Sequence, residues 1–173
     1  MVGEEAGEGL RWFPLFQNIE GRFALIVGGG SIALRRTRTL LRFACRLRII
    51  AERPRDELAA LALEHRGRIV LEQRPFCPGD CAAMGEAPVF AVAATNNRGV
   101  NRAVGLECAA AGIPVSVADC KEESTFYFPA IITSRYVVSG VSSGGLDHRA
   151  VKRAAARIRA ALEAGDGGTR STT

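Results

Sequence analysis

The 173-residue sequence lacks any run of 18 or more apolar residues, so we expect no helix that spans a membrane. Residues 1–11 are acidic and rich in glycine, without the basic and then apolar pattern of a signal peptide, and predict a disordered tail. Residues 165–173 predict a second such tail. The rest, in a chain that is 47% hydrophobic and 24% charged, is typical of a globular protein, which we expect in the cytoplasm.

Aromatic residues are also scarce, at 6%, and the 23 lysines and arginines are scattered over several segments. The net charge of +5 is compatible with nucleic acid and equally with a small polyanion, and charge alone does not decide between them. The resemblance described below leads us to expect the polyanion and no nucleic acid. The five cysteines are an odd number in a chain without an export signal, which is typical of free thiols. Cys77 and Cys81 have no second pair of candidate ligands, so we expect no structural metal site.

Short apolar runs alternate with helix-forming segments along most of the chain. This order implies right-handed crossovers and a mostly parallel sheet covered on both faces. We therefore predict an α/β fold with a Rossmann-like domain over residues 12–120. The expected strands are 23–28, 46–51, 68–72, 88–95 and 114–119, and the expected helices are 31–44, 52–67 and 100–112.

The ends of two helices carry recognisable signals. Pro54 suits the first turn of the second helix, and Gly67 suits its C-cap. Either Asn96 or Asn97 can cap the third helix, which is expected to stop at Gly112.

The pattern changes after residue 120. Two apolar runs, 125–133 and 136–143, follow each other around a short turn and predict an antiparallel pair of strands within a segment covering 121–146. A last helix is expected over 147–164, capped by Asp147, because its apolar residues recur at helical spacing.

The stretch VGGGSIA has the spacing of a dinucleotide-binding fingerprint. Gly28 permits a tight turn, Gly30 lets the backbone approach a pyrophosphate, and Ala33 allows close packing of helix on strand. An acidic residue, Glu52, ends the second strand 22 positions after Gly30 and can accept both ribose hydroxyls, which favours NAD. Arg53 and Arg55 lie close by in sequence and leave NADP as the alternative.

Ligands of such sheets bind beyond the carboxyl ends of the strands. Strands ending at Gly28, Thr95 and Asp119 should therefore present these residues along one rim. Asp119 is then placed to act as a proton acceptor near a bound nicotinamide, with a turn cap as the alternative role.

The chain resembles the precorrin-2 dehydrogenase/sirohydrochlorin ferrochelatase family, the N-terminal module of siroheme synthases. The resemblance covers residues 13–145 and rests on FPLFQNIEGR, LIVGGGSIALRR, VAATNNRGVN, VSVAD with FPAII, and VSGVSSGG. It implies NAD-dependent oxidation of precorrin-2, an eight-carboxylate tetrapyrrole, to sirohydrochlorin in siroheme biosynthesis. In bifunctional members the same cleft also inserts Fe2+ to give siroheme.

The resemblance also implies roles for particular residues. Asp119 matches the key aspartate, which assists deprotonation and metal entry, and Ser143 matches a substrate-cleft serine that is phosphorylated in some relatives. The remaining implied contacts are Ser31, Ile32, Glu52, Arg53 and Thr95 with the cofactor, and Asn101 and Gly144 with the substrate.

The chain departs from the family at two segments. Asn96 and Asn97 stand where relatives usually carry Asp, so this pair lacks charge for a metal role. LDHRAVKR follows SSGG and introduces His148, either a ligand or proton shuttle or simply a residue of the first helical turn. Two other functions stay open: a chelatase without oxidation, and a non-catalytic module that senses NAD.

A homodimer is also expected. The predicted antiparallel pair is too small to form a core alone, and its aromatic and β-branched residues need a partner surface. The resemblance implies a dimer through the same segment, 121–146.

Overall fold

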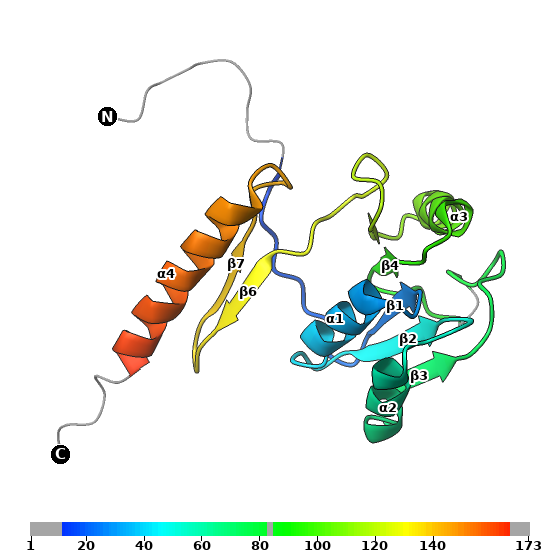
Figure 1. Ribbon diagram of the computed structural model, residues 1–173, viewed down its shortest axis with the longest axis horizontal. Coiled ribbons are helices and arrows are strands. Elements are labelled where there is room, and N and C mark those ends of the chain that lie inside the picture. Colours follow the sequence, from blue (N-terminus) through cyan, green and yellow to red (C-terminus); the bar gives the residue numbers. More distant parts are fainter. Residues whose placement is uncertain (1–11, 83–84, 167–173) are drawn as a thin grey trace. The chain divides into compact units, whose positions relative to one another are not determined.

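The structure is a computed structural model that describes residues 12–82 and 85–166 (Figure 1). Its described residues form two compact units: 18–126, and 12–17 together with 127–166. Residues 121–126, which we assigned to the antiparallel segment, thus belong to the first unit. None of the helices in the described ranges is long and apolar enough to cross a bilayer.

The first unit contains a five-stranded parallel sheet, as predicted. Its strand order is β3-β2-β1-β4-β5, so the topological switch point of the sheet lies between β1 and β4. All five residues of β1 are buried, as expected for a central strand covered on both faces. The strands are β1 (Phe23–Val27), β2 (Arg46–Ile50), β3 (Ile69–Glu72), β4 (Ala91–Ala93) and β5 (Val115–Val117).

Strand β4 is shorter than the predicted 88–95, although backbone hydrogen bonds to β1 continue on both sides of Ala91–Ala93. The amide of Val89 donates to Phe23 O at 2.9 Å, and the amide of Ala94 donates to Val27 O at 2.8 Å. The residues around the regular ladder therefore still follow β1, and Pro88 cannot extend the ladder because it has no N–H.

Helix α1 (Ser31–Leu40) ends four residues before the predicted residue 44. The guanidinium of Arg68 donates to the carbonyls of Leu41 at 3.0 Å and Cys45 at 3.1 Å, and also to that of Phe43. These carbonyls beyond the helix end are satisfied by a distant arginine instead of by another helical turn.

Helix α2 (Asp56–Glu64) is shorter than the predicted 52–67, and neither Pro54 nor Gly67 has its predicted place at the helix ends. Pro54 precedes the N-cap Arg55, because the Arg55 amide donates to Gly29 O at 3.0 Å and holds this segment extended. Gly67 lies beyond the C-cap, His65, whose carbonyl accepts from Arg68 and Ile69 at 2.8 Å each and leads the chain directly into β3.

Helix α3 (Arg98–Ala110) has the predicted caps. Asn97, one of the two candidates, accepts from the amides of Gly99 at 2.9 Å and Val100 at 3.2 Å. At the other end Gly112 has φ of 66°, and Ile113 N donates to Cys108 O at 2.8 Å, which completes a Schellman motif.

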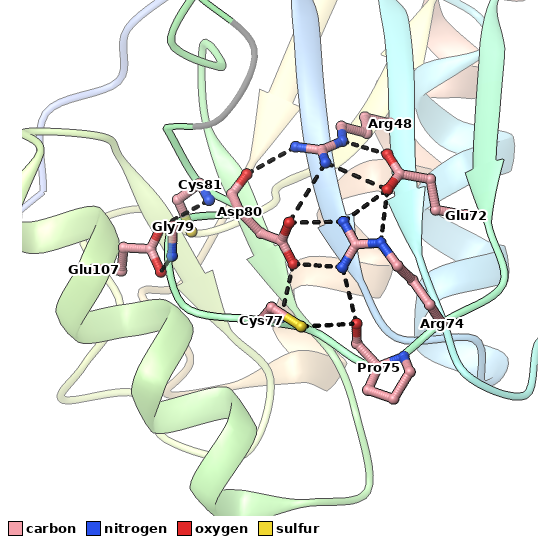
Figure 2. A network of polar contacts seen from close by, with 9 residues as sticks. All are labelled: Arg48, Glu72, Arg74, Pro75, Cys77, Gly79, Asp80, Cys81 and Glu107. Atoms are coloured by element: carbon pink, nitrogen blue, oxygen red, sulfur yellow. Dashed lines mark hydrogen bonds and ion pairs between the residues drawn. The ribbon is translucent and has the colours of Figure 1, made fainter.

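Helix α3 packs on β4 and β5, and the β3–β4 connection joins the same core. We call residues 73–82 of this connection the charged loop. Arg74 binds the Asp80 carboxylate at 2.7 Å through two nitrogens, and Arg48 from β2 donates to Asp80 O at 2.8 Å (Figure 2). Glu72 accepts from Arg48 at 2.6 Å and from Arg74 at 2.7 Å. Charged side chains of β2 and β3 thus bind the loop, in addition to its apolar contacts with the core.

The second unit contains the predicted antiparallel pair and the last helix. β6 (Ala130–Thr133) pairs with β7 (Val138–Val141), and α4 (His148–Asp166) packs on both. Asp147 caps α4 as predicted, because its carboxylate accepts from Ala150 N at 2.8 Å.

Strand β6 begins later than the predicted residue 125. Thr125 instead bonds the edge of β5, donating from its amide to Val115 O at 2.8 Å, and Pro129 lacks the N–H that an earlier start would need. The predicted tails lie outside the described residues, except that 165–166 continue α4.

Candidate active site

The turn after β1 tolerates only glycine at two positions. Gly28 has φ of 129°, and a Cβ there would lie 2.2 Å from Ala94 O. A Cβ on Gly29 would lie 2.6 Å from Cα of Pro54. Sequence reasoning assigned a role to Gly28 but missed Gly29, although the middle glycine of GGG was visible in the sequence. The turn is therefore wedged between the end of β4 and the segment before α2.

Gly30 differs from its two neighbours, since a Cβ there would meet no atom within 4 Å. Gly30 is the N-cap of α1, makes no side-chain cap, and is followed by a first turn without acidic residues. Ser31 and Ile32 are exposed at this helix end. An open face over backbone N–H groups with a positive helix dipole fits a pyrophosphate, so the residues present suit a dinucleotide.

Glu52 follows β2 and has an exposed side chain. Its nearest cation is Arg53, at 3.9 Å, and both side chains are solvated, so this pair is weak. Arg55 instead binds Glu57 at 3.0 Å. That hydrogen bond raises the pKa of Arg55. The Glu52 carboxylate is thus available for ribose hydroxyls, while Arg55 is engaged elsewhere.

A basic hollow of about 570 Å³ begins at the same helix end. Arginines supply most of its lining; two of them lie on α1 and a third in the turn that follows it. Sequence reasoning missed this hollow, although the i, i+3, i+7 spacing of these arginines was visible. It suits anions. The lining residues are Ser31, Leu34, Arg35, Arg38, Thr39, Arg42 and Arg55.

Thr95, at the end of β4, is held by Asn101. The Asn101 side chain is fully buried; its Oδ1 accepts from Thr95 N at 3.0 Å and lies 2.7 Å from Thr95 Oγ1, while its Nδ2 donates to Thr95 O at 3.1 Å. Asn101 therefore positions the rim at Thr95. Its substrate contact stays a prediction.

Asp119 follows β5 at the same rim, since Ala118 N donates to Ala93 O at 2.9 Å beside it. Its side chain is 37% exposed, and its Oδ1 lies 3.4 Å from Arg98 Nη1. Within the described residues its carboxylate accepts no backbone hydrogen bond, so nothing there supports the alternative role of a turn cap. The carboxylate faces solvent beside a cation.

Sequence reasoning missed Arg98 and Glu123, which accompany Asp119. Arg98 binds the Glu123 carboxylate through its second nitrogen, and this hydrogen bond raises the pKa of Arg98. Glu123 Oε2 is buried without a hydrogen-bond partner. No local pattern pointed to this cluster, because its members are 21 and 25 residues apart from Arg98.

Ser143 and Gly144 belong to the second unit. Ser143 Oγ accepts from Asp147 N at 2.9 Å and shapes the turn into α4. Gly144 has φ of 62°, and a Cβ there would lie 3.1 Å from Trp12 Cδ1. His148 is exposed in the first turn of α4. Among the described residues no group of three or more His, Cys, Asp or Glu side chains could hold a metal.

Residues 15–130 match a family model described as putative NAD(P)-binding. The chain belongs to this family. The match agrees with the NAD cofactor expected from the glycine turn and Glu52.

Curated relatives are similar over most of the chain. A probable multifunctional siroheme biosynthesis protein HemA of Ruminiclostridium josui is 39% identical over 155 residues, which are 89% of this chain and 29% of that protein. The siroheme synthase of Gluconacetobacter diazotrophicus is 39% identical over 154 residues, 89% of this chain and 32% of that protein. The chain thus spans about a third of the length of these relatives, and the resemblance drawn from the motifs is confirmed.

A solved structure titled "SirC, precorrin-2 dehydrogenase" has the same fold. It superposes with a TM-score of 0.68 at 22% identity, covering 87% of this chain and 71% of that one. The predicted Rossmann-like sheet followed by a small antiparallel pair and a helix is therefore confirmed.

Proposed function

We propose that this protein oxidises precorrin-2 to sirohydrochlorin with NAD+ in siroheme biosynthesis. The observation that carries the proposal is the rim itself: an open helix N-terminus at Gly30, an available carboxylate at Glu52 and a solvent-facing carboxylate at Asp119. The similarity to siroheme synthases over 89% of the chain supports this substrate.

The cofactor would be held at the carboxyl ends of β1 and β2. The backbone at Gly30, Ser31 and Ile32 would bind the pyrophosphate, and Glu52 would accept the adenosine ribose hydroxyls. NAD is favoured over NADP because Glu52 would repel a 2′-phosphate and Arg55 is engaged by Glu57. Bound NAD+ supplies the hydride acceptor.

Asp119 would take a proton. Oxidation of the substrate removes a hydride and also a proton, so it needs a base beside the hydride acceptor. The exposed Asp119 carboxylate can reach a ligand at the rim, and Arg98 at 3.4 Å can orient it. Thr95, fixed by Asn101, would line the rim between the two halves of the sheet.

The substrate is a polyanion, and the basic surplus of the chain would attract it. Ser143 and Gly144 stay the proposed substrate contacts of the second unit. Fe2+ would be a second substrate if the protein also inserts metal.

We propose a homodimer through the second unit, in the cytoplasm. Large apolar side chains are exposed at the start of β7 and in the turn before it: Tyr136 at 80%, Val137 at 42% and Val138 at 47%. A two-stranded sheet with such a surface gains stability by packing against a second copy.

The purified protein should convert precorrin-2 and NAD+ to sirohydrochlorin and NADH, followed by absorbance. Replacement of Asp119 by Asn should lower turnover at least about 100-fold and leave the Kd for NAD+ unchanged, because the residue acts on the substrate. NAD+ binding without any turnover by the unaltered protein would contradict the proposal and favour a sensing module. Addition of Fe2+ to the product tests metal insertion separately.

A further inference from the structure

Two thiols away from the rim lie together in the core of the first unit. The sulfurs of Cys81 and Cys108 are 3.6 Å apart. Both residues are buried, with 2% and 0% of their surface exposed, and both thiols are free. Cys81 lies in the charged loop and Cys108 in α3, so their contact joins two segments far apart in sequence.

The backbone around this contact is held by a separate interaction. Glu107, which precedes Cys108, accepts from Gly79 N at 3.1 Å and from Cys81 N at 2.8 Å (Figure 2). The carboxylate of α3 therefore fixes the loop backbone where the two sulfurs meet. The sulfur contact and the Glu107 hydrogen bonds both hold residues 79–81 against α3. The two sulfurs therefore need to move only a short distance to form a bond.

We propose that Cys81 and Cys108 form a reversible intramolecular disulfide by exchange with a low-molecular-weight disulfide such as oxidised glutathione. The Cys81 thiolate attacks one glutathione sulfur, breaks the S–S bond and releases one glutathione thiolate. The Cys108 thiolate then attacks the Cys81 sulfur and displaces the second glutathione. The two cysteines are oxidised, the glutathione disulfide is reduced to two thiols, and the two cysteine protons pass to the released glutathiones.

Opening of the charged loop controls the first step. Contact with Cys108 and burial raise the pKa of Cys81 far above its ordinary value, so the closed loop offers little thiolate. The loop is attached to β2 through the Asp80 carbonyl, which accepts from Arg48, and to the end of β3 through Arg74, which binds both Asp80 and Glu72. Only Cys81 has to reach the oxidant, since Cys108 attacks the Cys81 sulfur as the loop returns, and the loop closes once the second glutathione has left.

The test uses a variant in which Cys77 and Cys120 are replaced by Ser. Trypsin then places Cys81 alone in peptide 69–98 and Cys108 alone in peptide 103–121. After incubation with oxidised glutathione, mass spectrometry should find these peptides linked, and dithiothreitol should separate them. The linked protein should melt about 5–10 °C higher than the reduced one, because the bond constrains the unfolded chain. Glutathione adducts without linked peptides, or a linked protein with a lower melting temperature, would overturn the proposal.

Two further variants control for folding and access. Replacement of Cys108 by Ala should stop the reaction at a mixed disulfide on Cys81, whereas replacement of the buried Cys45 by Ala should leave the linkage unchanged. Should the Cys108 variant not fold, replacement of Asp80 by Asn provides an independent readout, since a looser loop should form the linked peptides about tenfold faster. An unchanged rate in that variant would contradict the role of loop opening.

Discussion

The turn at residues 28–30 and the charged loop at residues 73–82 both leave strands of one sheet, but different forces hold them. Around Gly28 a missing side chain lets the backbone approach Ala94, and no charge takes part. In the charged loop long side chains make the contacts: Asp80 is bound by Arg48 from β2 and by Arg74 from the loop itself. The glycine turn leaves the backbone at Gly30 exposed for a ligand, whereas the charged loop covers part of the hydrophobic core.

The largest expected effect is on stability, at the glycines of the turn. Replacement of Gly28 by Ala should lower the free energy of unfolding by about 3 kcal/mol or more, because the new Cβ meets a backbone oxygen at a positive φ. The matched control is Gly30→Ala, which meets no atom within 4 Å. It should change stability by less than about 0.5 kcal/mol and raise the Kd for NAD+ at least about tenfold.

Urea unfolding and calorimetric titration with NAD+ measure the two effects. A Gly30 variant that binds NAD+ as well as the unaltered protein would show that no ligand approaches this backbone. A Gly28 variant of normal stability would show that the turn is not wedged against β4.

The second test concerns charge. Replacement of Asp80 by Asn keeps the shape of the side chain but removes the partner of two arginines, one of them buried, and should cost about 2–3 kcal/mol in urea unfolding. The control is Glu57→Gln, which removes an exposed pair with Arg55 and should have no measurable effect.

The stabilisation that the Asp80 carboxylate contributes should also depend on pH. Hydrogen bonds from Arg74 lower the pKa of Asp80 in the folded protein, and hydrogen bonds from Arg48 lower that of Glu72. Because the folded pKa values lie below the unfolded ones, the stabilisation is present above the unfolded value for Asp, 3.8, and is lost as the pH falls through the folded value. The unaltered protein and Asp80→Asn should therefore differ at pH 7 and converge toward pH 2. A difference that stayed constant would mean that the charge of Asp80 contributes nothing.

The two regions also explain which features could be predicted. The glycine turn is encoded by neighbouring residues, so its spacing, its strand and its helix were all visible in sequence. The bonds of Arg68 that end α1 early and the bond of Gly29 to Arg55 that delays α2 come from segments elsewhere in the chain. No local pattern reports them. At the rim, the position of Asp119 was predicted because strand ends align. Arg98, which binds Asp119, and Glu123, which binds Arg98, come from other segments and were missed.

A third connection, between β4 and α3, could be predicted from the sequence only in part. It gives the smallest expected effect on stability. It is held by short side chains close in sequence, and the pattern alone could not decide between Asn96 and Asn97 as the cap. Replacement of Asn97 by Ala should lower stability by about 1 kcal/mol, because the amides of Gly99 and Val100 lose their acceptor. In the described structure the Asn96 side chain makes no such bond, so Asn96→Ala should leave urea unfolding unchanged. Equal losses of stability in the two variants would mean that the side chains of Asn96 and Asn97 share the cap. Local contacts in this connection would then be less specific than those of the glycine turn.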